Sequence, residues 1–335
     1  MAGSQVHQVR VATTARLHMG FLDMHGGLGR RFGSIGLSLE APATRLTAIP
    51  ANDFSAVGPG GPRAVASARL FAEHFGHVPG VHLCLEETIP EHAGLGSGTQ
   101  MALAVGVALA KLYELPITLD EIAASAERGA RSGIGIGAFS QGGLLVDGGR
   151  GADTRVPPVI ARMPFPEAWR VLLIFDHVQQ GVHGSQELEA FRALPEFPAD
   201  HAAELCRRVL MQALPAVAEN NLALFGEAIH AIQCRVGDHF APAQGGGRYT
   251  SRTVGHVLEW LRSEGVTCVG QSSWGPTGFA VLESEAAAQR MQEALELRYL
   301  GYPGLRFAVT KARNHGSEVH VICEDNIVGT VCATN

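Results

Sequence analysis

A glycine-rich turn that follows a proline and leads directly into a long apolar run is the feature that most constrains this fold. The turn reads Ile89-Pro90-Glu91-His92-Ala93-Gly94-Leu95-Gly96-Ser97-Gly98-Thr99-Gln100, and residues 101–112 behind it have helical spacing. Residues 81–85 before it alternate apolar and polar, as in a half-buried strand. The predicted order is therefore strand, glycine loop, helix.

This order is suited to holding a phosphate group. Glycines let the backbone come close to an anion, and the free N–H groups of the first helical turn point at the same spot as the positive end of the helix dipole. The alternative, on loop chemistry alone, is a strand-to-helix turn with a glycine-lined bend.

Length and composition indicate a globular protein with a sizeable core. The chain has 335 residues, is 46% hydrophobic and carries a net charge of −6, with Lys and Arg scattered rather than clustered. We therefore expect neither nucleic-acid binding nor attraction to an acidic membrane surface. No apolar run reaches the ~18 residues needed to span a bilayer, and the N-terminus lacks a signal-peptide pattern, so we expect a cytoplasmic protein. The six cysteines form no C-x-x-C pair, which favours reduced thiols.

The pattern along the chain is α+β. Strands are predicted over residues 6–17, 36–49, 81–85, 170–176, 266–269 and 279–282, with a final pair near the C-terminus, and helices over 62–74, 101–112, 119–131, 202–214, 221–236 and 253–264, with another ending at 300. Residues 20–34 are too rich in glycine and arginine for a plain hairpin. A second glycine cluster (132–137) precedes a hairpin-like segment (142–149). The Pro-rich stretch 157–166 predicts a boundary between lobes 1–156 and 157–335.

Three pieces together resemble the GHMP kinase superfamily. They are the strand-rich start, the Pro-x-x-x-Gly-Leu-Gly-Ser loop at residues 90–97, and Ser-x-Gly-Pro-Thr-x-Phe at residues 273–279. The resemblance implies a two-lobed α+β fold, with a ribosomal-protein-like N-terminal lobe that carries the phosphate loop and an α/β-sandwich C-terminal lobe. The late glycine loop would close over the substrate cleft.

Within that superfamily the chain looks like the β-ribofuranosylaminobenzene 5'-phosphate synthase family. The matching segments are residues 15–23, 26–37, 180–187, 270–277 and 312–316. The resemblance implies a decarboxylating transferase of tetrahydromethanopterin biosynthesis, which joins 5-phosphoribosyl 1-diphosphate to 4-aminobenzoate or 4-hydroxybenzoate and releases pyrophosphate and carbon dioxide. It also implies a homodimer.

The family reaction assigns roles to the phosphate loop. Backbone donors would hold the leaving pyrophosphate, with Mg²⁺ bridging its oxygens; these donors are Gly94, Leu95, Gly96, Ser97, Gly98 and Thr99. Ser97 or Glu127 is the candidate Mg²⁺ ligand, because superfamily kinases place a Glu on the helix before the second glycine cluster. A solvated helix carboxylate is the other interpretation of Glu127.

Arg30, Arg31 and Asp23 lie in the early glycine-rich segment. The two guanidinium groups could clamp the ribose 5-phosphate or the benzoate carboxylate, or be solvated loop charges. Asp23 could stabilise positive charge at the anomeric carbon or bind ribose hydroxyls, or be a turn residue.

The remaining candidates face the aromatic ring. His183, with Glu187, is placed against the ring's amino group, and Ser272, Ser273 and Trp274 are placed in the late loop, where Trp274 either stacks on the ring or is simply buried. We interpret His18 as a satisfied core histidine of a strand. The spacing of His315, Glu318 and His320 fits no standard metal site.

Two other functions stay open from the sequence. An ATP-dependent small-molecule kinase could use the same loop, although residues 133–141 hold no carboxylate where kinases with a catalytic base carry an Asp. Gly98 also stands where the superfamily loop usually has another Ser. A non-catalytic binder of a phosphorylated metabolite is the third possibility, which the polar groups of the Arg30 and Ser272 segments disfavour.

Overall fold

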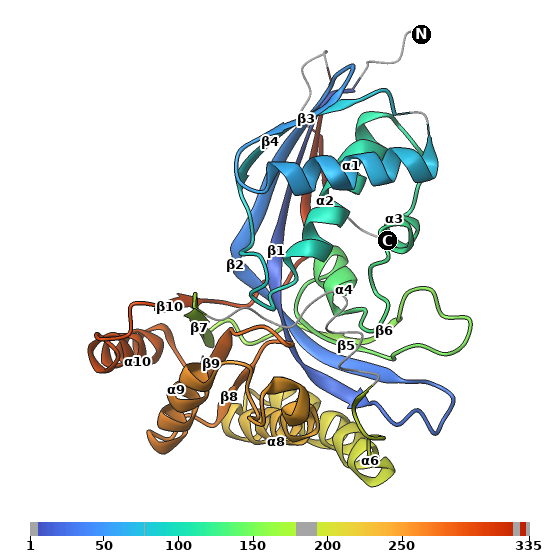
Figure 1. Cartoon of the computed structure of the whole chain (residues 1–335). Coiled ribbons are helices and arrows are strands. Elements are labelled where there is room, and N and C mark those ends of the chain that lie inside the picture. The colour runs from blue at the N-terminus through green and yellow to red at the C-terminus, as the bar shows by residue number, and fades with distance from the viewer. Residues whose placement is uncertain (1–5, 77, 179–192, 324–328, 333–335) are drawn as a thin grey trace.

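The computed structural model describes residues 6–76, 78–178, 193–323 and 329–332. Its strands are β1 (Val6–Asp23), β2 (Phe32–Pro50), β3 (Phe54–Val57), β4 (Val81–Glu87), β5 (Leu144–Asp147), β6 (Val159–Met163), β7 (Arg170–Asp176), β8 (Cys268–Gln271), β9 (Gly278–Leu282), β10 (Leu305–Thr310), β11 (Glu318–Cys323) and β12 (Gly329–Cys332). Its helices are α1 (Gly61–Phe75), α2 (Ser97–Leu112), α3 (Leu119–Ser125), α4 (Ile134–Ser140), α6 (Ala199–Arg208), α7 (Leu214–Ala218), α8 (Leu222–Phe240), α9 (Arg252–Ser263) and α10 (Glu285–Arg298), with the short turns η1 (Val209–Ala213) and η2 (Ala241–Gln244). Two sheets with helices packed on them confirm the predicted two-lobed α+β class (Figure 1).

The two longest strands form an antiparallel ribbon that runs through both lobes. β1 has 18 residues and β2 has 19. A strand advances about 3.3 Å per residue, so the ribbon is roughly 60 Å long. One end carries the larger sheet, and the other lies against α6 and α8 (Figure 1). The glycine-rich segment 20–34 closes this ribbon as a hairpin, with Asp23 paired to Phe32, and its long loop also pairs with Arg150 through Arg31, so it is no plain hairpin.

The larger sheet has eight strands in the order β12-β11-β1-β2-β4-β3, with β5 also pairing with β2 and β6 with β5. Helix α2 packs against β1 and β2 of this sheet and against α1, which itself packs on β3 and β4. Its apolar residues occupy nearly every face, as expected for a helix buried on all sides, and eleven of its sixteen residues are buried. The predicted helix therefore sits at the centre of this lobe.

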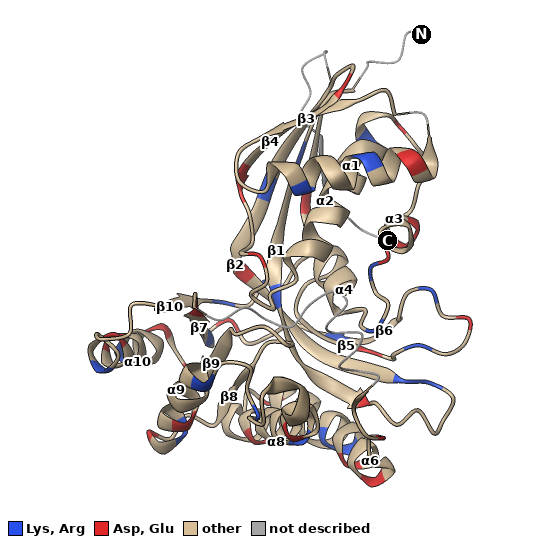
Figure 2. Ribbon diagram, in the orientation of Figure 1, with Lys and Arg blue, Asp and Glu red and all other residues tan. Residues whose placement is uncertain are grey.

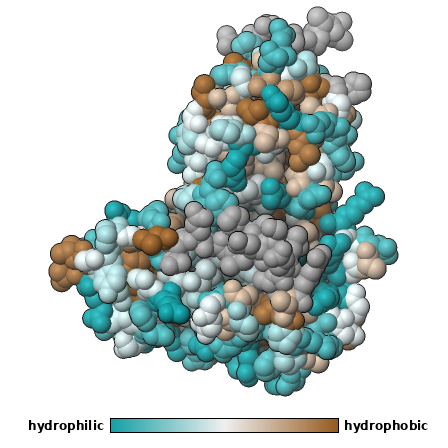
Figure 3. Space-filling model, viewed as in Figure 1, coloured by the Kyte–Doolittle hydropathy of each residue, from teal (hydrophilic) through white to brown (hydrophobic). Residues whose placement is uncertain are grey.

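The smaller sheet has the order β10-β7-β9-β8 and packs against α8, α9 and α10. Helix α8 also packs closely against the ribbon at Gly20. A Cβ on Gly20 would lie only 2.4 Å from the Ile232 side chain. On the other side of α8, a Cβ on Gly270 would lie 2.5 Å from Gln233. Basic and acidic residues are interspersed along the helices of this lobe (Figure 2). Leu297 and Leu300, at the end of α10, are exposed, and Figure 3 shows hydrophobic surface there.

Most predicted elements are present, and one is much shorter than expected. The helix predicted over residues 119–131 ends at Ser125. Glu127 and Gly129 both have positive φ angles, 52° and 82°, which a helix does not contain. Glu127 therefore lies in a turn and not on a helix, which corrects the helical position assumed for the Mg²⁺ ligand.

The lobe boundary at residue 157 stays a prediction. Strand pairing places β6, β11 and β12 in the larger sheet, although all three follow residue 157. The chain thus returns to the first sheet after building the second. Buried Arg313, beside β11, secures this return by pairing with Glu40 of β2 at 3.0 Å and with Glu318 at 2.8 Å.

Candidate functional site

The glycine loop joins the end of β4 to the start of α2, in the predicted order. Gly94 and Gly96 have φ angles of 75° and 87°, which residues with a Cβ rarely adopt. Gly96 is the residue before the helix, and no side chain caps the first turn. The N–H groups of Ser97, Gly98 and Thr99 are therefore left for an external acceptor.

The late motif docks on this loop across β1. Ser272 Oγ donates to the Gly94 carbonyl at 2.8 Å and accepts from the His18 N–H at 3.1 Å. The Ser273 N–H donates to the His18 carbonyl at 3.0 Å. A Cβ on Gly94 would lie 2.3 Å from the Ser272 carbonyl oxygen. Two motifs that are 178 residues apart thus meet over the middle of one strand.

Three arginines surround the loop, and the sequence analysis gave none of them a role. Arg16 Nη1 donates to the Gly94 carbonyl at 2.6 Å. A Cβ on Gly98 would lie 3.4 Å from Arg128 Nη1 and 3.5 Å from Arg63 Nη2. Burial and the nearby Arg63 charge lower the pKa of Arg128. Two cations thus converge on the first turn of α2, where the absent side chain of Gly98 leaves space. Arg63 is also paired with Glu91 of the loop, at 2.6 Å.

A sequence signal existed only for Arg16, which lies within one of the family segments. Arg63 follows Pro62 at the start of a helix, and Arg128 lies in what reads as a helix tail. Nothing in that spacing says that the two side chains approach each other.

A narrow pocket with aromatic walls opens beside the late motif. It is lined by His18, Phe21, Phe240, Ser273 and Trp274, among others. Trp274 is 5% exposed and meets Phe240 edge-on, with ring centroids 4.6 Å apart. Trp274 is therefore buried and also lines the pocket, and its stacking on the aromatic ring stays a prediction.

His18 departs from the interpretation of a satisfied core histidine. Its side chain is 5% exposed, and its Nε2 atom has no hydrogen-bond partner. Burial, and then the Arg16 charge, lower its pKa to about 3, so the ring is neutral. A buried polar atom without a partner costs stability, so it calls for an explanation.

Asp23, Arg30 and Arg31 lie at the closed end of the ribbon and have local partners. Asp23 accepts from the Gly26 N–H at 2.8 Å. Arg30 donates to the Gly148 and Gly149 carbonyls at 2.8 Å, and Arg31 donates to the Met24 carbonyl. The described contacts do not bring these three side chains onto the glycine loop.

The metal candidates form no preassembled cluster. Among the described residues, no group of three or more His, Cys, Asp or Glu side chains could hold a metal ion. This covers His315, Glu318 and His320, of which Glu318 is paired with Arg313. Ser97 opens α2 and Glu127 is exposed in its turn. His183 and Glu187 lie outside the described residues.

The second glycine cluster holds a carboxylate that is fully engaged. Asp147 is buried, and its oxygens accept hydrogen bonds from Ser34 Oγ, Ser132 Oγ and the N–H groups of Gly133 and Gly149. Burial raises its pKa, and these bonds oppose that rise. Asp147 therefore fixes the turn that leads into α4.

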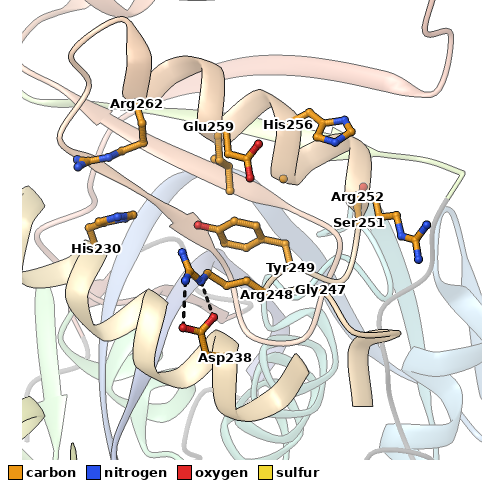
Figure 4. A pocket seen from close by; sticks show the side chains of 12 residues that line it. His230, Asp238, Gly247, Arg248, Tyr249, Ser251, Arg252, His256, Glu259 and Arg262 are labelled. Carbon is orange, nitrogen blue, oxygen red and sulfur yellow. Dashed lines mark hydrogen bonds and ion pairs between the residues drawn. The ribbon is translucent and has the colours of Figure 1, made fainter. Parts of the chain in front are cut away.

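A wider cavity of about 550 Å³ lies between α8 and α9 (Figure 4). Arg248 crosses it and pairs with both oxygens of Asp238, at 2.7 and 3.0 Å. None of the predicted site residues lines this cavity. The glycine loop and the narrow pocket, rather than this cavity, thus form the candidate active site.

Comparison with protein families matches both lobes. The GHMP kinases N terminal domain matches residues 63–143, and the GHMP kinases C terminal domain matches residues 213–300. A β-ribofuranosylphenol 5'-phosphate synthase from Archaeoglobus fulgidus is 34% identical over 93% of this chain and 100% of its own length. One from Methanocaldococcus jannaschii is 31% identical over 92% of this chain and 99% of its own length.

Solved structures support the fold. The homoserine kinase from Cytophaga hutchinsonii superimposes with a TM-score of 0.67 at 17% identity, covering 95% of this chain and 98% of that one. In the described part of this chain, no helix is both long and apolar enough to cross a membrane.

Because the two motifs pack together at Gly94, we predict that Gly94→Ala strongly lowers both activity and stability. The Cβ would strike the Ser272 carbonyl, so we expect loss of turnover and a lower melting temperature. Gly245→Ala is the matched control, because Gly245 has a positive φ, 69°, in the left-handed helical region, and open space around it. The control should cost about 1 kcal/mol of unfolding free energy, from backbone strain alone. Equal effects of the two variants in thermal unfolding and turnover would contradict the docking.

Proposed function

This chain belongs to the β-ribofuranosylphenol 5'-phosphate synthase family of the GHMP kinase superfamily, and from that membership we propose how its site works. The enzyme is a decarboxylating phosphoribosyltransferase of tetrahydromethanopterin biosynthesis, which condenses 5-phosphoribosyl 1-diphosphate with 4-hydroxybenzoate. The observation that carries this function is the 34% identity to the Archaeoglobus fulgidus synthase along nearly the whole chain.

The reaction forms a carbon–carbon bond and breaks two others. The ring carbon that bears the carboxylate attacks the anomeric carbon, and pyrophosphate leaves with the electron pair of its bond to the sugar. Carbon dioxide then departs, and the pair from its bond to the ring restores aromaticity. A phenol product corresponds to a hydroxyl group para to the attacking carbon, and 4-aminobenzoate would give the aminobenzene product by the same steps.

The glycine loop supports binding of the pyrophosphate. The backbone donors from Gly94 to Thr99 would meet its oxygens at the positive end of α2. Arg63 and Arg128, which flank Gly98, would add charge-assisted hydrogen bonds to the same oxygens. Together these groups stabilise negative charge as it develops on the leaving group, which lowers the barrier.

Mg²⁺ fits this site as an ion that travels with the pyrophosphate. Magnesium is usually bound by one or two protein oxygens plus phosphate oxygens. The hydroxyl of Ser97 and the carboxylate of Glu127 would be those protein ligands, since Glu127 precedes Arg128, which reaches Gly98. When bound, the ion would neutralise charge on the leaving pyrophosphate.

The acceptor and the sugar would be held by groups on either side of the loop. We place the ring beside Ser272, Ser273 and Trp274, which adjoin the loop through β1. Asp23, Arg30, Arg31 and His183 remain our proposed contacts to the sugar, its phosphate and the ring. Arg30 and Arg31 would have to give up their present carbonyl partners to bind an anion.

Kinase chemistry is disfavoured at this site. Ile134 or Gly135 stands at the position aligned with the catalytic Asp of kinases, and neither has a carboxylate. Gly135 packs near Thr99 of the first turn of α2. Asp147 is the nearby buried carboxylate, and its hydrogen bonds leave it engaged. A substrate hydroxyl would therefore lose a proton-transfer term of about 10²–10⁴ in rate.

We also propose a cytoplasmic homodimer. The location is consistent with a biosynthetic enzyme acting on phosphorylated small molecules. The dimer follows from the family resemblance, and the exposed apolar end of α10 offers surface that such a contact would bury.

The function is tested by incubating the purified protein with Mg²⁺, 5-phosphoribosyl 1-diphosphate and carboxyl-labelled 4-hydroxybenzoate or 4-aminobenzoate. We expect release of labelled carbon dioxide that depends on the phosphoribosyl donor, with equimolar pyrophosphate. A parallel reaction with ATP in place of the donor should release none. The proposal would be contradicted if neither acceptor released labelled carbon dioxide, or if the protein used ATP to phosphorylate an alcohol.

Arg128→Ala tests the arginine pair. We expect the KM for 5-phosphoribosyl 1-diphosphate to rise about 10- to 100-fold, because a charge-assisted hydrogen bond contributes about 1.5–3 kcal/mol, while the KM for the benzoate changes little. Arg69→Ala, on the exposed side of α1, is the control and should match the wild type. An unchanged donor KM in Arg128→Ala would remove this residue from the site.

A further inference from the structure

The buried ring of His18 lines the narrow pocket, and its Nε2 atom has no hydrogen-bond partner. Burial lowers the pKa of His18 to about 3, so the ring is neutral and one of its two nitrogens is an acceptor. We assign the proton to Nδ1, because the backbone of His18 favours the protonated ring, and this assignment leaves Nε2 with a free lone pair.

The other polar side chains around the pocket are largely occupied. The three glutamines that line it bind one another and nearby backbone groups; they are Gln233, Gln244 and Gln271. Arg248, which reaches the same pocket, is paired with Asp238. These groups are held in place, whereas the buried Nε2 of His18 is left for a ligand.

The walls and size of the pocket suit one edge of an aromatic ring. Phe21 meets the His18 ring with centroids 4.6 Å apart, and Phe240 and Trp274 form a further aromatic pair. The cavity of about 30 Å³ has room for roughly two water-sized groups, since one water needs about 10–15 Å³. A hydroxyl and the ring carbon that carries it would fill this space, with the opposite side of the ring at the mouth.

The pocket also lies next to the glycine loop. The His18 N–H donates to Ser272 Oγ, which in turn donates to the Gly94 carbonyl. Ser272 thus connects the strand that carries His18 directly to the glycine loop.

We propose that His18 Nε2 accepts a hydrogen bond from the hydroxyl group para to the reacting carbon, and so selects acceptors that carry a donor at that position. The proposal rests on the proposed function for the identity of the acceptor. Electron density drawn toward the hydroxyl oxygen feeds into the ring and makes the para carbon more nucleophilic. Because the pKa of His18 is low, the proton stays on the hydroxyl oxygen, and the histidine acts as an acceptor and not as a base.

The test compares the binding of 4-hydroxybenzoate and benzoate by calorimetry in the presence of pyrophosphate and Mg²⁺. The wild type should bind the hydroxyl compound at least about tenfold more tightly, since a site built for a hydroxyl rejects the analogue without it. In His18→Phe the ratio should fall toward one, and the melting temperature should not drop, because a buried unpartnered atom is removed. His18→Gln, whose amide oxygen can accept, should recover part of the ratio.

Ser317→Ala is the matched control, because Ser317 Oγ is likewise buried without a partner but does not line the pocket. It should leave the ratio unchanged. A wild-type ratio that persists in His18→Phe, or a ratio near one in the wild type, would overturn the proposal. If wild-type protein discriminates through His18 yet releases no carbon dioxide with either benzoate, the pocket assignment stands and the proposed function fails.

Discussion

The backbone of β1 between Arg16 and His18 is the point on which the site depends. It binds the glycine loop through the Arg16 N–H to the Leu95 carbonyl and the Arg16 side chain to Gly94. Two residues further along the same edge, it binds the late motif through both backbone groups of His18. Because these contacts are made by a central strand of a long ribbon, the two loops cannot shift independently. One strand thus fixes the glycine loop and the late motif relative to each other.

The charged side chains near the first turn of α2 determine which reaction the site favours. Two guanidinium groups approach the first turn of α2, where Gly98 provides no side chain. The nearby second glycine cluster contains no carboxylate, and Asp147 of β5, which accepts a hydrogen bond from the cluster, is fully engaged. A site rich in anion-binding groups and poor in bases suits departure of pyrophosphate better than activation of an alcohol. The same superfamily fold can thus serve a transferase.

Local patterns predicted much of the fold, because periodicity and glycine turns are local properties. The strand, loop and helix around Gly94 are found where the sequence placed them. The helix after Thr118 was predicted too long, since a positive φ at Glu127 cannot be read from an alanine-rich pattern. The approach of Arg63 to Arg128 and the unpartnered nitrogen of His18 depend on tertiary packing. Spacing along the chain carries no signal for either.

The most direct test of this account is a crystal structure of the protein with pyrophosphate, Mg²⁺ and 4-hydroxybenzoate. The account predicts pyrophosphate at the first turn of α2, between Arg63 and Arg128, and the hydroxyl of the benzoate within hydrogen-bond distance of His18 Nε2. The carboxyl-bearing carbon would face the pyrophosphate across the docked loops. Pyrophosphate bound at the cavity between α8 and α9, or a benzoate held away from His18, would contradict it.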